Sequence, residues 1–155
     1  MDDLAFDHLD YLILNYKEGM RVKELEVCHF KLGPRIWIGA FSYTLSDGTN
    51  SITLPLVGIN EGVTCVKTEL VADEFVYEYD LRAYTESGSG KKGISKIDFK
   101  DGEGETLYTK GIITGNEYHE DFTDAQGYFV GMYGVYNTVI NYLGPLYYRT
   151  DCTCD

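Results

Sequence analysis

The sequence predicts an all-β fold that closes on itself from three similar parts. Its 155 residues include 14 Tyr, 7 Phe and 17 Gly but only 3 Pro. Aromatic residues favour strands, and glycine favours the tight turns between them. A pair of strands closed by a turn recurs within residues 25–49, 75–102 and 129–148. Three copies of such a unit favour a closed structure over an open solenoid.

The spacing of matching residues supports this threefold order. The Asp-Gly turns that begin at Asp47 and Asp101 lie 54 positions apart, and Phe75 and Phe129 are separated by the same 54 positions. The alternative is an ordinary β-sandwich in which such equal spacings between similar residues arise by chance. We expect pseudo-threefold symmetry.

Length and charge limit the class of protein and its partners. A chain of this length forms one domain, and 44% apolar with 25% charged residues is typical of a folded protein. The net charge of −12 and the pI of about 4.5 argue against nucleic acid or an anionic membrane as the main partner. No apolar run is long enough for a membrane span. The acidic start at residues 1–4 does not resemble a secretory signal, so we expect a cytoplasmic protein if Met1 is the native start.

The first 19 residues do not match the β pattern of the rest, and we expect an arm packed on the domain edge. Leu4, Leu9, Leu12 and Ile13 fit one face of a short helix, whereas residues 11–14 also fit a strand. Both alternatives stay open. From Met20 onward the pattern is that of strands.

The strands of the first part are separated by strong turn signals. Residues 22–27 form the first strand, and Gly-Pro within residues 30–35 turns the chain. A long strand covers residues 36–45 and ends at the turn of residues 46–50. Residues 52–57 form a further strand, which Pro55 places at a sheet edge, and residues 63–70 extend again.

The second and third parts repeat this order. Residues 74–84 alternate strictly between apolar and polar side chains, so one face of this strand is buried. A flexible loop at residues 87–93 leads to a strand at 94–100 and a turn at Asp101-Gly102. A short strand follows at 107–109, with a possible extension to 113. The third part consists of strands at 129–133 and 139–148, joined by a turn that Asn137-Thr138 supplies.

The four cysteines point to neither a disulfide framework nor a metal site. Cys28 and Cys65 lie in strand-like apolar contexts, where we expect small buried hydrophobic side chains. Disulfides are not the default in a cytoplasmic protein. Cys152 and Cys154 lie in a tail of residues 151–155, without a second pair of ligands at metal-binding spacing. We therefore expect no metal and no cofactor.

No motif in the chain points to catalysis. His8, His29 and His119 are scattered, and His119-Glu120-Asp121 is typical of a solvated acidic turn. The stretch of residues 87–93 matches neither a nucleophile elbow nor a phosphate-binding loop. We expect a binding or structural protein rather than an enzyme.

Three stretches carry a resemblance to the jacalin-related lectin domain. Residues 35–50, which end in Phe-Ser-Tyr and Asp-Gly-Thr, resemble the family's first long strand and turn. Residues 73–100 resemble its middle sheet. Residues 129–144, with glycines at 131, 134 and 144, resemble its closing strand pair. The resemblance covers residues 20–150 and implies the β-prism I fold, with three four-stranded Greek-key sheets and pseudo-threefold symmetry.

The resemblance also implies a sugar site, from which this sequence departs. The family's loop reads Gly-x-x-x-Asp, and its carboxylate accepts hydrogen bonds from two sugar hydroxyls. Here Asn137 stands in place of the Gly and Asn141 in place of the Asp, and the chain lacks the family's Gly-Gly pair. An amide keeps one acceptor but loses the stronger charge-assisted bonds. The family positions for the ligand are Gly134, Val135, Tyr136, Asn137, Thr138 and Asn141.

Two of three symmetry-related loops carry basic residues. If the threefold order holds, loops 31–35, 88–93 and 134–138 lie at one end of the prism. Lys31, Arg35, Lys91 and Lys92 would then form a basic rim that attracts an acidic partner surface. Simple scatter of charges is the alternative.

Together these features predict a non-enzymatic jacalin-like module whose sugar site has degenerated. We expect an intracellular protein-interaction or structural component. Its partners would be other proteins within a cytoskeletal or other assembly. The alternative is a working lectin of mannose or galactose type that binds glycans through Asn141 and the backbone of residues 134–138.

Overall fold

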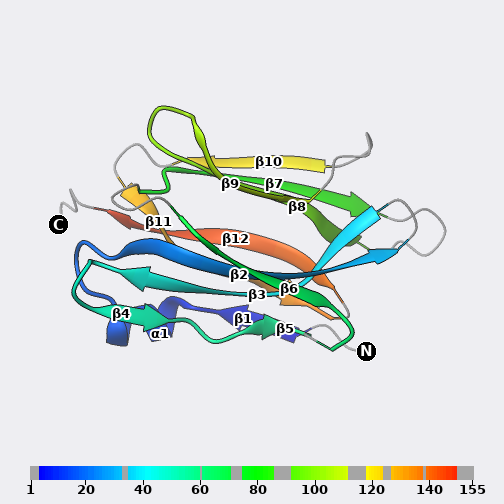
Figure 1. Cartoon of the computed structure of the whole chain (residues 1–155), viewed down its shortest axis with the longest axis horizontal. Helices are drawn as coiled ribbons and strands as arrows, with labels where there is room; N and C mark the ends of the chain where they lie inside the picture. The colour runs from blue at the N-terminus through cyan, green and yellow to red at the C-terminus, as the bar shows by residue number, and fades with distance from the viewer. Residues whose placement is uncertain are drawn as a thin grey trace.

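The computed structural model contains three antiparallel sheets whose strands run roughly along the long axis of the molecule (Figure 1). It describes residues 4–32, 35–59, 61–70, 75–85, 92–111, 118–123, 127–137 and 139–149. Among these residues, no helix has the length and apolar character that a membrane crossing requires.

The first sheet is built from the first predicted part. It contains β2 (Arg21–Leu32), β3 (Arg35–Ser46), β4 (Ser51–Thr53), β5 (Val57–Gly58) and β6 (Thr64–Glu69). The strand order is β4-β3-β2-β6, and β5 also pairs with β3. The single strand predicted for residues 52–57 is therefore two short strands on either side of Pro55, which has no N–H to donate to a ladder. The edge position predicted for it is confirmed.

The second sheet is a complete Greek key. It contains β7 (Glu78–Thr85), β8 (Lys92–Lys100), β9 (Thr106–Gly111) and β10 (Tyr118–Thr123), in the order β10-β7-β8-β9. The predicted alternation of β7 is confirmed, because Tyr79, Leu81 and Ala83 are buried in the core. Lys100 on the neighbouring strand forms ion pairs with Glu78, at 3.0 Å, and with Asp80, at 2.6 Å.

The third sheet joins the two ends of the described chain. It contains β1 (Leu4–Asp7), β11 (Gly127–Tyr136) and β12 (Ile140–Arg149), in the order β1-β11-β12. After β1 the chain forms the helix α1 (Leu9–Asn15), which packs Leu12 into the core beside β11. The helix alternative is confirmed for Leu9, Leu12 and Ile13, and the strand alternative for residues 11–14 is wrong, because these residues lie within α1. Leu4, predicted on the same helix face, lies in β1 instead.

The three sheets follow one plan, as the sequence predicts. Each has a hairpin of two long strands, namely β2–β3, β7–β8 and β11–β12, and a return strand beside the first of them, which is β6, β10 or β1. The second strands of the hairpins contact one another along the middle of the molecule. The all-β prediction with three sheets is confirmed. The sheets contain five, four and three strands among the described residues rather than four each.

Aromatic side chains from all three sheets meet at Phe129, which is fully buried. Its ring lies 4.9 Å from Phe99 and 5.8 Å from Tyr79, both on the second sheet, and 6.2 Å from Tyr43 on the first. Aromatic pairs at such distances add to the energy of burial. The tyrosine and phenylalanine content that predicts strands therefore also builds the centre of the core.

The structure corrects the prediction for two of the cysteines. Cys28 and Cys65 form a disulfide between β2 and β6, where they are directly opposite each other. Cys28 is fully buried, but Cys65 is exposed rather than a buried hydrophobic residue. The prediction was wrong because the two strand contexts are 37 residues apart in sequence, and only the strand register brings the cysteines together. Cys152 and Cys154 lie outside the described residues.

His8 joins β1 to α1 and is a buried polar group, only 5% exposed. Its Nδ1 lies 2.7 Å from the hydroxyl of Tyr43, and its backbone N–H donates to the carbonyl oxygen of Met132. The rings of Phe6 and Phe41 pack around the imidazole. Burial lowers the pKa of His8 to about 4, although the neighbouring Asp7 opposes this shift.

We expect acid to destabilise the fold through His8. The unfolded chain takes up this proton near pH 6.5, but the folded chain does so only near pH 4, so the stability present above pH 6.5 is lost as the pH falls. Between pH 7 and pH 4.5 the loss from this group is about 2.5 kcal/mol. Urea unfolding at both pH values should show that His8→Phe reduces the pH dependence. An equal pH dependence in the variant would contradict this role.

Candidate functional site

The three long hairpins end at the same end of the molecule. A Cβ atom on Gly93, at the start of β8, would overlap the ring of Trp37, near the start of β3. The same atom would lie 3.1 Å from Cγ2 of Val139 in the β11–β12 turn. Since these residues come from three different hairpins, the described ends of the three hairpins lie together there.

The β11–β12 hairpin forms a tight turn at the positions of the predicted sugar loop. Its last pair is Tyr136 opposite Ile140. The N–H of Asn137 donates to the carbonyl oxygen of Val139 at 2.9 Å, and the N–H of Val139 donates to Oδ1 of Asn137 at 3.3 Å. Asn137 therefore holds the turn closed, as the turn prediction requires. Thr138 lies outside the described residues.

Asn141 links this hairpin to the second sheet. Its Nδ2 donates to the carbonyl oxygen of Lys92 at 2.6 Å. Its Oδ1 is buried and has no hydrogen-bond partner among the described residues. A buried polar atom without a partner is costly, so a bound hydroxyl group that reached this oxygen would satisfy it. The amide thus offers one acceptor while its donor is used within the fold.

Gly134 has a structural role. It pairs with Phe6 on β1 and with Leu143 on β12, and a Cβ atom here would overlap the carbonyl oxygen of Tyr142. Glycine is therefore required so that the strands can approach each other. Its presence at a family glycine position reflects the packing of the sheet.

Aromatic rings lie along the same hairpin. Tyr133 is 38% exposed, and its ring centroid is 6.2 Å from that of Tyr142. Tyr136 is half-buried and lies 6.2 Å from Phe6, whereas Val135 pairs with Ala5 at the edge. The apolar face of a ring-shaped ligand packs well on such side chains, which offer large area with a polar tip. Tyr133 and Tyr142 flank the predicted positions, but Tyr142 directly follows Asn141 on β12 and so points to the opposite face of the sheet.

The predicted basic residues lie at the same end, as far as they are described. Lys31 and Lys92 are exposed at the ends of the β2–β3 and β7–β8 hairpins. Arg35 opens β3, but its side chain is not among the described ones, and Lys91 lies outside the described residues. A single basic rim formed by these four residues remains a prediction.

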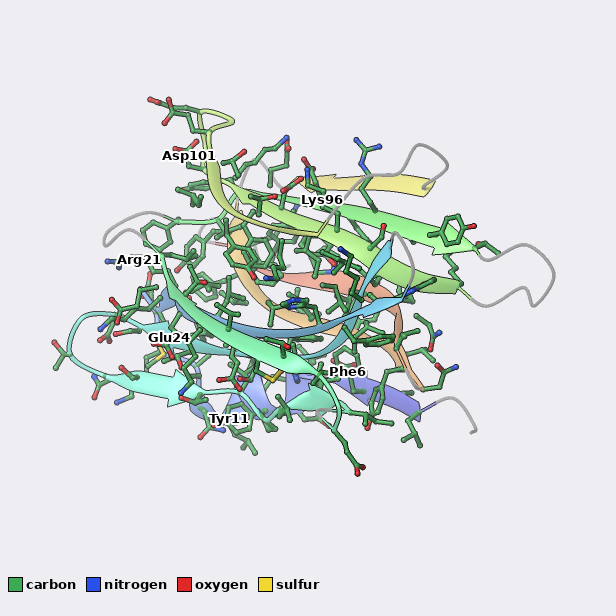
Figure 2. The ribbon with its side chains drawn as sticks, turned by 45° about the vertical axis from the view of Figure 1, so that its right-hand side comes forward. Phe6, Tyr11, Arg21, Glu24, Lys96 and Asp101 are labelled. Carbon is green, nitrogen blue, oxygen red and sulfur yellow. A yellow bond between two sulfur atoms is a disulfide. The ribbon has the colours of Figure 1, made fainter. Side chains whose placement is uncertain are left out.

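Charges elsewhere are separated from this end and from the helix. Figure 2 shows Lys96 and Asp101 on the second sheet, on the side of the molecule opposite Phe6 and Tyr11. Lys96 pairs with Asp98 at 3.6 Å.

Comparison with known proteins identifies the fold. No family model matches the sequence, and no curated protein matches it. Among solved structures, a complex of jacalin with melibiose has 19% identity and a TM-score of 0.67, and the alignment covers 92% of this chain and 97% of jacalin. A mannose-binding jacalin-related lectin from Ananas comosus has 14% identity and a TM-score of 0.67, with coverages of 96% and 91%. Artocarpin with methyl-α-mannose has 19% identity and a TM-score of 0.64, with coverages of 82% and 83%.

These matches confirm the predicted fold. The chain has the β-prism of the jacalin-related lectins over nearly its whole length. The identity to these structures is 14–19%, so the likeness shows the fold.

Proposed function

We propose that this jacalin-type β-prism is a carbohydrate-binding module that holds a neutral hexose at the β11–β12 hairpin. The unpartnered Oδ1 of Asn141 carries the proposal, because it leaves a fixed acceptor at the position of the family's sugar-binding carboxylate. The similar solved structures include complexes with galactose and mannose derivatives. This favours the lectin alternative over the degenerate site that the sequence analysis preferred.

The chemistry of the site predicts weak binding of a single sugar. Asn141 supplies one neutral acceptor, and such a bond contributes about 1 kcal/mol, against about 1.5–3 kcal/mol for a bond to a charged group. We therefore expect clear binding only when several sugars are displayed together.

The test uses Asn141. Asn141→Ala removes the acceptor and should weaken binding about fivefold, a loss of about 1 kcal/mol. Asn141→Asp loses the bond to the Lys92 carbonyl oxygen but gains a charged acceptor, and we expect it to bind several-fold more tightly. A glycan array followed by calorimetry on the best sugar measures both effects.

Asn50→Ala is the matched control, because Asn50 is an exposed asparagine in the turn after β3, at the other end of that strand from Trp37. It should bind like the wild type. Wild-type binding that survives Asn141→Ala would place the sugar elsewhere and refute this site. If neither the wild type nor Asn141→Asp binds any glycan, carbohydrate binding is refuted.

A protein-interaction module is the second candidate, favoured by α1. Ile13 and Leu14 on this helix are 70% and 83% exposed, which is unusual for large apolar side chains on a chain of this charge. Binding of sugar by Asn141→Asp but not by the wild type would support this candidate, because it would show a prism with a disabled site. An intracellular place in a cytoskeletal or other assembly belongs to this second proposal.

We propose binding rather than catalysis for either candidate. The similar solved structures are described as lectins. A panel of glycoside substrates checks this point, and turnover of any of them would overturn it.

A further inference from the structure

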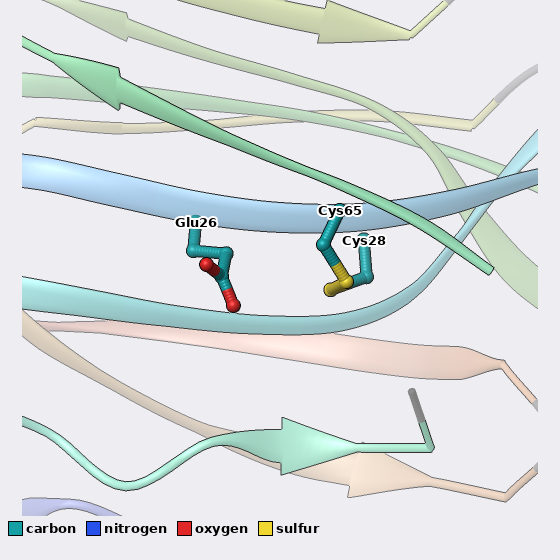
Figure 3. Close-up of side chains that lie close together, drawn as sticks. All are labelled: Glu26, Cys28 and Cys65. Atoms are coloured by element: carbon teal, nitrogen blue, oxygen red, sulfur yellow. A yellow bond between two sulfur atoms is a disulfide. The ribbon is translucent and has the colours of Figure 1, made fainter. Parts of the chain in front are cut away.

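The outer face of the β2–β6 pair brings three potential metal ligands together. Cys28 on β2 lies directly opposite Cys65 on β6, and Glu26 lies two residues before Cys28 on the same strand. Residues two apart on a strand point to the same face of the sheet. Figure 3 shows the carboxylate of Glu26 beside the two sulfur atoms.

The distances between the three groups would allow them to bind one metal ion. The two sulfur atoms and a carboxylate oxygen of Glu26 all lie within 4.8 Å of one another. Cys28 is buried and Glu26 is 26% exposed, whereas Cys65 is exposed. The cluster is thus fixed on its β2 side and open to solvent on its β6 side. In the disulfide form the sulfur atoms are bonded to each other and provide no thiolate.

We propose that reduction of this disulfide creates a site for a soft divalent metal such as Zn²⁺, held by Cys28, Cys65 and Glu26. A dithiol reductant supplies two electrons and two protons, which convert the disulfide to two thiols, and itself becomes a disulfide. A phosphine reductant supplies the two electrons and takes up the oxygen of a water molecule, whose two protons end on the thiols. Metal binding then releases both thiol protons to solvent, because the thiolate is the ligand. This inference is independent of the proposed carbohydrate site.

The ligand set matches the preference of zinc and cadmium for sulfur. Zn²⁺ binds thiolates at about 2.3 Å and carboxylate oxygens at about 2.0–2.2 Å, usually with four ligands in a tetrahedron. Three protein ligands leave the fourth position for water. The sulfur atoms must move apart for this geometry. β6 is an edge strand with mostly exposed side chains, so it can adjust without disturbing the core.

Lys67 should weaken the binding of a metal ion at this site. It lies opposite Glu26 in the strand register, and its ammonium group forms an ion pair with the carboxylate at 3.9 Å. Lys67 is 68% exposed, so the pair is weak and easily broken. A metal ion would compete with this ammonium for Glu26 and be repelled by its charge. Removal of Lys67 should therefore tighten metal binding.

The test titrates the full chain with Cd²⁺ and follows the thiolate-to-cadmium charge-transfer absorbance. All proteins carry Cys152→Ser and Cys154→Ser, which excludes the thiols of the tail. We expect one Cd²⁺ per reduced chain, no such absorbance from the oxidised chain, and none after Cys28→Ser and Cys65→Ser. Glu26→Gln should weaken binding about tenfold while one Cd²⁺ per chain is retained, and Lys67→Met should strengthen it.

Reduction of the disulfide can itself destabilise the fold. Circular dichroism and thermal unfolding of the reduced chain, with and without Cd²⁺, therefore measure whether metal binding stabilises it. A rise in the melting temperature of the reduced chain with Cd²⁺, or regain of its β signal, supports the site. Absence of a charge-transfer band in the reduced chain would overturn it. Equal Cd²⁺ affinity in the Glu26→Gln variant would remove Glu26 from the site and overturn the proposal as stated.

Discussion

Replacing both Cys28 and Cys65 with alanine should lower the free energy of unfolding by about 4 kcal/mol. The disulfide joins residues 37 positions apart, and closing a loop of that size in the unfolded chain has an entropic effect of this order. Loss of the bond leaves the edge strand β6 held to β2 by the antiparallel ladder without a covalent link. Denaturant unfolding, followed by the fluorescence of the buried Trp37, measures the change.

The control for this variant is the replacement of Cys152 and Cys154 by serine, which we expect to leave the unfolding midpoint unchanged. A loss of less than about 1 kcal/mol in the Cys28 and Cys65 variant would show that the bond contributes little to the fold. A typical domain has about 5–15 kcal/mol of stability. We therefore expect the variant to remain folded in the absence of denaturant.

Phe129→Ala should have an effect of similar size, about 3–5 kcal/mol. Phe129 is fully buried where the three sheets meet, and its ring contacts Tyr43, Tyr79 and Phe99. Truncation removes these contacts and leaves a cavity that side chains from three sheets cannot fill together. Denaturant unfolding of the wild type and of the variant measures the loss in the free energy of unfolding.

Two further variants distinguish the effect of a cavity in the core from the effect of shortening any large apolar side chain. Phe129→Leu keeps most of the volume, so we expect a clearly smaller loss than for alanine. Leu14→Ala removes a large apolar side chain that is 83% exposed, and it should change stability by less than about 0.5 kcal/mol. Equal losses for Phe129→Ala and Leu14→Ala would contradict the central role of Phe129.

The turns show how well local chemistry is encoded in the sequence. The Asp-Gly signals at Asp47 and Asp101 predict turns, and each aspartate accepts backbone hydrogen bonds within its own turn. Oδ1 of Asp47 binds the N–H groups of Thr49 and Asn50, and Oδ1 of Asp101 binds those of Glu103 and Glu105. Such bonds form between near neighbours in the chain, so they need no knowledge of the fold.

The candidate site was only partly open to prediction. The sequence places Asn137 and Asn141 on either side of a turn, and the structure agrees. It gives no sign that Nδ2 of Asn141 binds the carbonyl oxygen of Lys92, because this partner lies 49 positions away on another sheet. The unpartnered oxygen that supports the proposed function depends on that contact.

The sequence by itself determined most of the strands, the turns and the threefold order, because side-chain alternation, aromatic content and Asp-Gly signals act over a few residues. It did not predict β1 or β10, and the solvated acidic turn predicted for residues 119–121 is wrong, because these residues lie within β10. Only the tertiary structure decided that residues 4–15 form a strand and a helix and that Cys28 faces Cys65. It also decided that Oδ1 of Asn141 has no hydrogen-bond partner within the part of the chain that the structure describes. Each of these depends on register between segments far apart in the chain. A shift of one residue in a strand turns every side chain to the other face, so pairing across sheets is fixed only when the whole core packs.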